Sequence, residues 1–261
     1  MDAAHPCVTL TVEDGLGTLL MQGRHANALN ADLLEALTRT LQQAETDRGV
    51  RGLMLASAGK LFSPGLDLVE LIEYDRATMS RFMERFDSCL FALYTCSKPV
   101  VAAVSGHAVA GGCVLALATD HRVLREDAMI GLNEVQVGVP LPFGVALLLR
   151  ETVGPRRLEE VALLGRNYTN EEAVEVGLVH EVADARDFGA TCRERLAGYA
   201  AKDPCAFAAT KHYLRRPTVE RIRASDALFR PEFLDCWFSD RTQERIRAMV
   251  DSLQSRSGKA R

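Results

Sequence analysis

The chain has 261 residues, of which 31 are lysine or arginine and 35 are aspartate or glutamate, so its formal charge is −4. Hydrophobic residues make up 48% and charged residues 25%, which is typical of a globular protein with a buried core and excludes a long disordered or fibrous chain. The acidic balance disfavours binding of a polyanion through bulk charge, and we expect no nucleic-acid partner.

Seven cysteines lie along the chain without a C-x-x-C pair or a histidine at ligand spacing. This pattern argues against a disulfide framework and a zinc site, and we expect no metal. The central run without charge, residues 108–118, is shorter than the roughly 18 residues of a membrane-spanning helix, so we expect no membrane partner. The N-terminal residues lack leader features and the C-terminal tripeptide is not S-K-L, which makes a cytoplasmic location the expectation.

The N-terminal residues predict a β-hairpin followed by a helix. Val8 to Glu13 alternates apolar and polar residues, Asp14-Gly15 predicts a turn, and Leu16 to Met21 is apolar again. Asn30 is suited to cap the helix that follows. Its apolar residues recur at the i, i+3/i+4 spacing of a buried stripe: Leu33, Leu34, Leu37 and Leu41.

Strand and helix patterns continue to alternate through the middle of the chain. Strands are predicted at Gly52 to Ala56 and at Pro99 to Val104. Between them, apolar residues recur at helical spacing: Phe82, Phe86, Leu90 and Leu93. This order favours an α/β fold, with a mixed or mostly parallel sheet covered by helices.

The character of the chain changes in its C-terminal part. Gly111-Gly112 begin an apolar run to Ala118, and a strand is predicted at His121 to Leu124. Beyond about residue 185 the pattern predicts only helices, over 187–201, 204–215, 218–229 and 241–254, with breaks at Pro204, Pro217 and Pro231. We therefore expect an α/β core over residues 1–200 and a helical region over residues 201–261 that serves as a lid or an oligomer surface.

Common nucleotide-binding and hydrolase motifs do not match. Ser57-Ala58-Gly59-Lys60 lacks the first glycine and the following Ser or Thr of a P-loop, and Gly106 to Gly111 is not G-x-G-x-x-G. Ser105 lies outside a G-x-S-x-G elbow. The six histidines are scattered, and each is better explained as a surface or packed residue than as a ligand.

Two glycine turns each lie between a predicted strand and a predicted helix. In residues 62–68, Pro64-Gly65 imposes a tight turn and Asp67 suits the first turn of a helix. Residues 110–113, Ala-Gly-Gly-Cys, likewise precede an apolar helix. Backbone N–H groups at such helix starts have no intrahelical partner. Two of them that converge on one point make an oxyanion hole, although either turn alone is better explained as an ordinary turn.

Three segments together resemble the core blocks of the crotonase superfamily, the enoyl-CoA hydratases and isomerases. They are FSPGLDL, KPVVAAVSGHAVAGGCVLALATDHRVL and IGLNEVQVGVPLPFG, and the likeness runs from about Val8 to the end of the chain. The motifs GLDL, AGGC and GLNE-x-Q-x-G are most similar to the mitochondrial-type Δ3,Δ2-enoyl-CoA isomerases. The resemblance implies a ClpP/crotonase-like fold with mixed sheets of ββα repeats, an acyl-CoA substrate, no cofactor besides its coenzyme A, and a homotrimer or dimer of trimers.

The resemblance also implies catalytic roles. The backbone N–H groups of Leu66 and Gly111 would bind the thioester oxygen, and Glu134 stands where the family keeps its general acid/base. Hydratases hold a second glutamate at the position of Val114. Adding water is work that paired carboxylates share, whereas one carboxylate suffices to move a C3=C4 double bond to C2=C3. We therefore expect an isomerase, with another crotonase reaction such as enoyl-CoA hydration, or a non-catalytic acyl-CoA or RNA binder, as alternatives.

The remaining expectations concern the walls of the site. An apolar wall of Val114, Leu115, Val139 and Leu141 would exclude water and raise the pKa of Glu134. The family's adenine loop corresponds to residues 25–29, and Asn133 is a second donor beside the base or simply a cap. The substrate-binding residues expected on this basis are Arg24, Ala26, Ala28, Leu29, Ser63, Gly65, Asp67, Leu68, Val114, Asn133 and, from this or a neighbouring subunit, Lys211.

Overall fold

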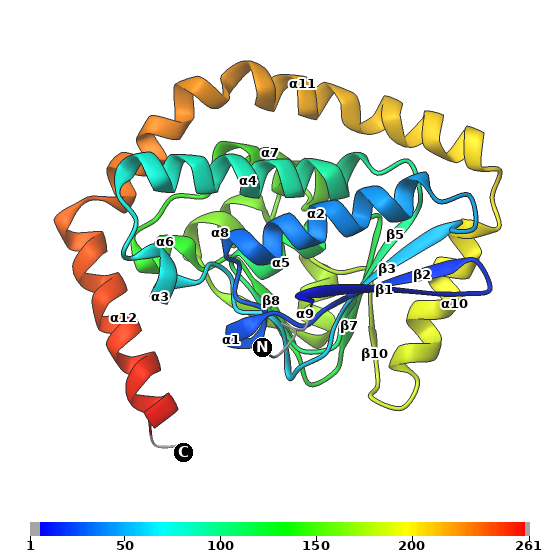
Figure 1. The fold of residues 1–261 in the computed structure, drawn as a ribbon, viewed down its shortest axis with the longest axis horizontal. Coiled ribbons are helices and arrows are strands. Elements are labelled where there is room, and N and C mark those ends of the chain that lie inside the picture. Colours follow the sequence, from blue (N-terminus) through cyan, green and yellow to red (C-terminus); the bar gives the residue numbers. More distant parts are fainter. Residues whose placement is uncertain (1–5, 259–261) are drawn as a thin grey trace.

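The computed structural model describes residues 6–258 (Figure 1). The expectations about a leader and a C-terminal address fall in part on residues 1–5 and 259–261, which lie outside the described residues. Within residues 6–258, no helix combines the length and the apolar character that crossing a bilayer requires.

The larger of two β-sheets has six strands in the order β1-β2-β3-β5-β7-β10. β1 and β2 are antiparallel, as predicted, with Val8 opposite Met21, and every other neighbouring pair is parallel. The mixed, mostly parallel sheet is therefore confirmed. Its strands are β1 (Val8–Glu13), β2 (Leu16–Met21), β3 (Gly52–Ser57), β5 (Val100–Val104), β7 (His121–Arg125) and β10 (Glu181–Ala183).

The smaller sheet has four strands of three residues each, in the order β4-β6-β8-β9. The first three are parallel to one another, and β9 runs antiparallel to β8. The sequence does not predict these strands, because three residues are too few to display an alternating pattern. They are β4 (Leu61–Ser63), β6 (His107–Val109), β8 (Met129–Gly131) and β9 (Asn167–Thr169).

The two sheets are connected by a repeating unit. β3, β5 and β7 of the larger sheet are each followed by one strand of the smaller sheet and then by a short helix. These helices are α3 (Leu68–Leu71), α5 (Gly111–Leu117) and α6 (Glu134–Val137). Because β4, β6 and β8 are parallel neighbours, the segments that leave their carboxyl ends lie at one edge of the sheet. The expected ββα repeats therefore place the predicted catalytic residues next to one another.

Helices cover both faces of the larger sheet. α2 (Ala31–Thr46) begins at Asn30, whose Oδ1 accepts the Leu33 N–H at 3.0 Å, as the predicted cap requires. α2 packs against β1, β2 and α4 (Arg76–Thr95), whereas α10 (Phe188–Ala200) packs against β3, β5 and β7. The remaining short helices are α1 (Arg24–Asn27), α7 (Phe143–Thr152), α8 (Leu158–Leu164) and α9 (Asn170–Glu175).

The C-terminal region is helical, and the predicted break at Pro204 agrees with the structure, whereas the breaks predicted at Pro217 and Pro231 are wrong. α11 (Pro204–Trp237) is one helix of 34 residues that runs through Pro217 and Pro231, and α12 (Asp240–Gly258) follows it. Pro204 begins α11, where a missing N–H costs nothing. An interior proline opposes a helix by about 3 kcal/mol, but α11 lies along α4 and α7 (Figure 1), and this packing offsets the loss.

Candidate active site

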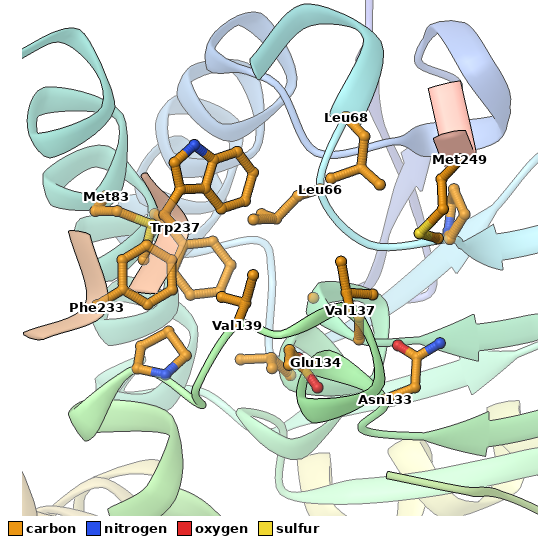
Figure 2. A pocket seen from close by; sticks show the side chains of 16 residues that line it. Leu66, Leu68, Met83, Asn133, Glu134, Val137, Val139, Phe233, Trp237 and Met249 are labelled. Atoms are coloured by element: carbon orange, nitrogen blue, oxygen red, sulfur yellow. The ribbon is translucent and has the colours of Figure 1, made fainter. Parts of the chain in front are cut away.

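An apolar cavity of about 100 Å³ lies at the edge formed by the three repeats. α3, α5 and α6, with the turns and loops next to them, supply one part of its lining, and α4, α11 and α12 supply the other (Figure 2). The lining residues are Pro64, Leu66, Leu68, Met83, Phe86, Ala110, Gly111, Val114, Asn133, Glu134, Val137, Val139, Pro142, Phe233, Trp237 and Met249.

The turn after β4 leaves the backbone N–H of Leu66 free of the neighbouring segment at Leu29. Leu29 forms a parallel bridge with Leu66, in which the Leu29 N–H donates to the Gly65 oxygen at 2.7 Å and the Asp67 N–H donates to the Leu29 oxygen at 3.0 Å. In a parallel bridge the residue between these two bonds turns its own N–H to the opposite side. The Leu66 N–H therefore points away from Leu29.

The turn after β6 supplies a second donor. Ala110 has φ +49° and ψ −122°, a conformation that alanine rarely adopts, and Gly111 then begins α5. As the first residue of a helix, Gly111 has an N–H without an intrahelical acceptor. The two turns are in contact, since a Cβ added to Gly65 would lie 3.2 Å from the Gly111 nitrogen. Two adjacent amides of this kind suit a developing negative charge on one oxygen.

Glu134, the first residue of α6, brings a carboxylate to the same cavity. Its Oε2 atom is buried, and no described residue provides it with a hydrogen-bond partner. Burial raises the pKa of Glu134 from its ordinary 4.5 to about 7, because the apolar surroundings disfavour the charged form. A carboxyl group with this pKa both accepts and returns a proton near neutral pH.

The short helix α6 is fixed at its far end. Gly138 ends it in the left-handed conformation, with φ +99°, and its oxygen accepts the Thr242 hydroxyl of α12 at 3.0 Å. The Gln136 side-chain amide donates to the Gly165 oxygen at 2.6 Å. Contacts from α12 and from the end of α8 therefore hold the helix that carries Glu134.

The structure brings six of the predicted site residues to the cavity: Leu66, Leu68, Gly111, Val114, Asn133 and Glu134. Three others build the β4 turn. The Ser63 hydroxyl donates to the Asn27 oxygen at 2.8 Å and accepts the Gly65 N–H at 3.2 Å. Asp67 caps α3, and its Oδ2 lies 2.9 Å from Nδ1 of His25. Their direct contact with a substrate stays a prediction.

The predicted adenine loop lies beside this turn. Leu29 is fully buried, and Ala28 is buried and donates its N–H to the His25 oxygen at 3.3 Å. Ala26 is exposed and left-handed, with φ +58°. Arg24 is exposed, with its nearest guanidinium nitrogen 3.8 Å from Asp32. Arg24 and Ala26 are thus exposed, whereas Ala28 and Leu29 are buried, and contact of any of them with coenzyme A stays a prediction.

Lys211 lies outside the cavity. Its Nζ is 2.7 Å from Asp120, which also accepts from Arg215 at 2.7 Å, and all three side chains are buried or nearly so. Burial lowers the pKa of Lys211, while the Asp120 charge opposes that shift. Within this chain the ammonium therefore has a structural ion pair, which the sequence did not predict, and its assignment to coenzyme A stays a prediction.

The sequence did not identify the individual residues of the far wall of the cavity. Val114 and Val139 line the cavity as expected. Leu115, the residue after Val114 on α5, is turned by about 100° relative to it and is buried in the core. Pro142 rather than Leu141 lines the cavity. The missed lining residues come from α4, α11 and α12: Met83, Phe86, Phe233, Trp237 and Met249. Among them, only Phe86 belongs to a helical pattern that indicated a buried residue, and that pattern does not show what the side chain faces.

Known proteins similar to this chain carry both isomerase and hydratase names. Enoyl-CoA delta isomerase 1, mitochondrial, of Mus musculus is 28% identical over 260 residues, which cover 98% of this chain and 90% of that protein. A probable enoyl-CoA hydratase of Bacillus subtilis is 30% identical, over 94% of this chain and 95% of that protein.

The fold comparison points to the same group. The crystal structure of human mitochondrial Δ3-Δ2-enoyl-CoA isomerase superposes with a TM-score of 0.91 at 27% identity, covering 96% of this chain and 99% of that one. The family model described as enoyl-CoA hydratase/isomerase matches residues 11–249. This chain therefore belongs to the enoyl-CoA hydratase/isomerase family, and its fold is the crotonase fold.

Proposed function

We propose that the protein is an acyl-CoA isomerase that moves a C3=C4 double bond to C2=C3. The observation that carries this proposal is the single buried carboxylate of Glu134, which lies in an apolar cavity together with the two glycine turns. By the family resemblance, Val114 stands where hydratases hold their second glutamate, and this valine is buried and apolar. One proton-transfer group is sufficient for a double-bond shift.

The proposed reaction has two proton transfers. Deprotonated Glu134 removes a proton from C2 of the 3-enoyl thioester, and the electron pair moves into a dienolate. The amides of Leu66 and Gly111 stabilise the negative charge that forms on the thioester oxygen, where losing one such donor typically costs about 3 to 4 kcal/mol. Glu134 then returns the proton to C4, which restores the carboxylate. No resident cofactor or metal is part of this proposal.

The decisive experiment uses 3-enoyl-CoA as substrate and follows the appearance of the conjugated 2-enoyl thioester. Glu134→Gln keeps the shape of the side chain but removes its basicity, so we expect kcat to fall by about 10²- to 10⁴-fold while the substrate still binds. An unimpaired variant would remove Glu134 from the mechanism.

Hydration of a 2-enoyl-CoA is the second candidate, because a relative at 30% identity is named a probable hydratase. Incubation with 2-enoyl-CoA separates the two reactions. Rapid formation of 3-hydroxyacyl-CoA at a rate above that of isomerisation favours hydration, whereas its absence favours the isomerase. Assembly into a homotrimer or a dimer of trimers is proposed by family resemblance, and sedimentation of the purified protein tests it.

A further inference from the structure

The cavity beside Glu134 has an open end and a closed end. Two of the lining residues are exposed, Pro64 and Met249, and Met249, which is 39% exposed, marks the open end. Figure 2 shows Met83, Phe233 and Trp237 together on the opposite side. The four side chains of this closed end are at most 5% exposed: Met83, Phe86, Phe233 and Trp237. A chain that enters past Met249 and passes Glu134 therefore ends against aromatic rings.

The cavity is small for a ligand that must also place its reacting carbons there. An apolar cavity of about 150 Å³ holds a benzene molecule, which corresponds to about 25 Å³ for each carbon. By this measure, the cavity of about 100 Å³ holds about four carbons. Leu66, Gly111 and Glu134 line this same space, so these carbons include the reacting ones. Little room is left for a longer tail.

The closed end is also fixed in place. Arg230 of α11 lies 3.0 Å from Asp87 of α4, and both side chains are largely buried. Arg76 at the start of α4 lies 2.6 Å from Asp235, five residues beyond Arg230 on α11. The buried pair of Arg230 and Asp87 holds the segment of α11 that carries the aromatic rings against α4, and the exposed Arg76–Asp235 pair adds little to this. The wall is therefore held in place, and a chain that overfills such a packed site forces side chains out of their preferred rotamers.

The chemistry of the lining selects an apolar chain. Among the described residues that line the cavity, Glu134 is the one that carries a formal charge. A carboxylate at the far end of the acyl chain would find no positively charged partner in the cavity and would lose its hydration. The cavity thus favours hydrocarbon chains and disfavours dicarboxylic ones.

We propose that Phe233 and Trp237 of α11 set a length limit on the acyl group, so that the site accepts apolar chains of about four to six carbons and rejects chains of about eight or more. This inference rests on the proposed function only for the acyl-CoA nature of the ligand. The limit itself comes from the volume and the closed end.

The protein contains its own reporter, because Trp237 is its single tryptophan and lies at the closed end. Saturated acetyl-, butyryl-, hexanoyl-, octanoyl- and decanoyl-CoA are titrated while tryptophan fluorescence is recorded. We expect affinity to rise about fourfold for each CH₂ that enters, the fold-change equal to about 0.8 kcal/mol. It should then fall at least tenfold between hexanoyl- and decanoyl-CoA. Affinity that rises or levels off through decanoyl-CoA would overturn the proposal.

Variants of the wall keep the reporter in place. Phe233→Ala removes a ring from the closed end and should restore octanoyl-CoA binding at least tenfold, and the milder Phe233→Leu should restore part of it. Leu228→Ala, on an exposed side chain of the same helix, is the matched control and should leave the length profile unchanged. A length profile identical in all three variants would contradict the assignment of Phe233 to the limit.

Turnover of a 3-enoyl-CoA series separates this inference from the proposed function. If no 3-enoyl-CoA is converted while saturated ligands show the limit, the isomerase proposal fails and the length limit stands. If 3-decenoyl-CoA is converted as fast as 3-hexenoyl-CoA, the length limit fails and the isomerase proposal stands.

Discussion

Replacing Glu134 with glutamine should change how the stability of the protein depends on pH. The buried carboxyl binds its proton more tightly in the folded chain than in the unfolded chain, because its pKa rises from 4.5 to about 7 on folding. Its contribution to stability is therefore fully present below about pH 4.5 and is lost as the pH rises through about 7. Glutamine does not titrate, so the variant lacks this loss.

The size of the effect follows from the shift. Raising the pKa from 4.5 to about 7 corresponds to about 3 kcal/mol of unfolding free energy. Other groups titrate in the same range, including Asp87, whose pKa burial raises to about 6. They titrate in both proteins, so the difference between variant and wild type isolates Glu134.

Urea unfolding, followed by the fluorescence of Trp237 at one protein concentration from pH 4.5 to 8.5, measures this difference. Relative to wild type, Glu134→Gln should gain about 3 kcal/mol across that range. Glu220→Gln, at an exposed carboxylate paired with Arg216, is the control and should follow wild type at every pH. If the curves of Glu134→Gln and wild type run parallel, the carboxyl is not buried in the folded protein and the reasoning about its basicity fails.

Three further substitutions test the scaffold by urea unfolding. Asp120→Asn leaves Lys211 with an uncompensated buried charge and should cost about 3 to 5 kcal/mol, whereas Glu220→Gln should leave the midpoint unchanged. Ala110→Gly relieves a positive φ and should stabilise the fold by about 1 kcal/mol, and no gain would argue against strain there. Gly112→Ala places a Cβ 2.3 Å from the Ser63 oxygen and should cost roughly 1 to 3 kcal/mol, so an unchanged midpoint would contradict the contact between the turns.

The longer elements could be predicted because several residues repeat one pattern. Val8–Glu13 and Ala31–Thr46 each show their period over their full length. The strands of the smaller sheet could not be predicted in this way, because their pairing partners rather than their own sequence define them. The error at Pro217 has a different cause, since a local rule against helix was outweighed by packing of α11 on α4 and α7.

The residues of the site also differ in whether the sequence indicates them. The resemblance of three sequence segments to one family pointed to Leu66, Gly111 and Glu134, and the structure places all three at one cavity. Phe233 and Trp237 lie about 100 residues beyond Glu134, and only the folded chain places them opposite it. The partner of Lys211 was missed for the same reason, because Asp120 lies 91 residues earlier.

The ββα repeats also determine which parts of the site a single substitution can remove. Two of the three contributions, from the turns after β4 and β6, are main-chain groups, which every amino acid except proline retains. The third, after β8, is a side chain that one codon change replaces without altering the course of the backbone. The proposed binding of an acyl thioester therefore depends on the course of the main chain, whereas the proposed proton transfer depends on a side chain that substitution can change during evolution.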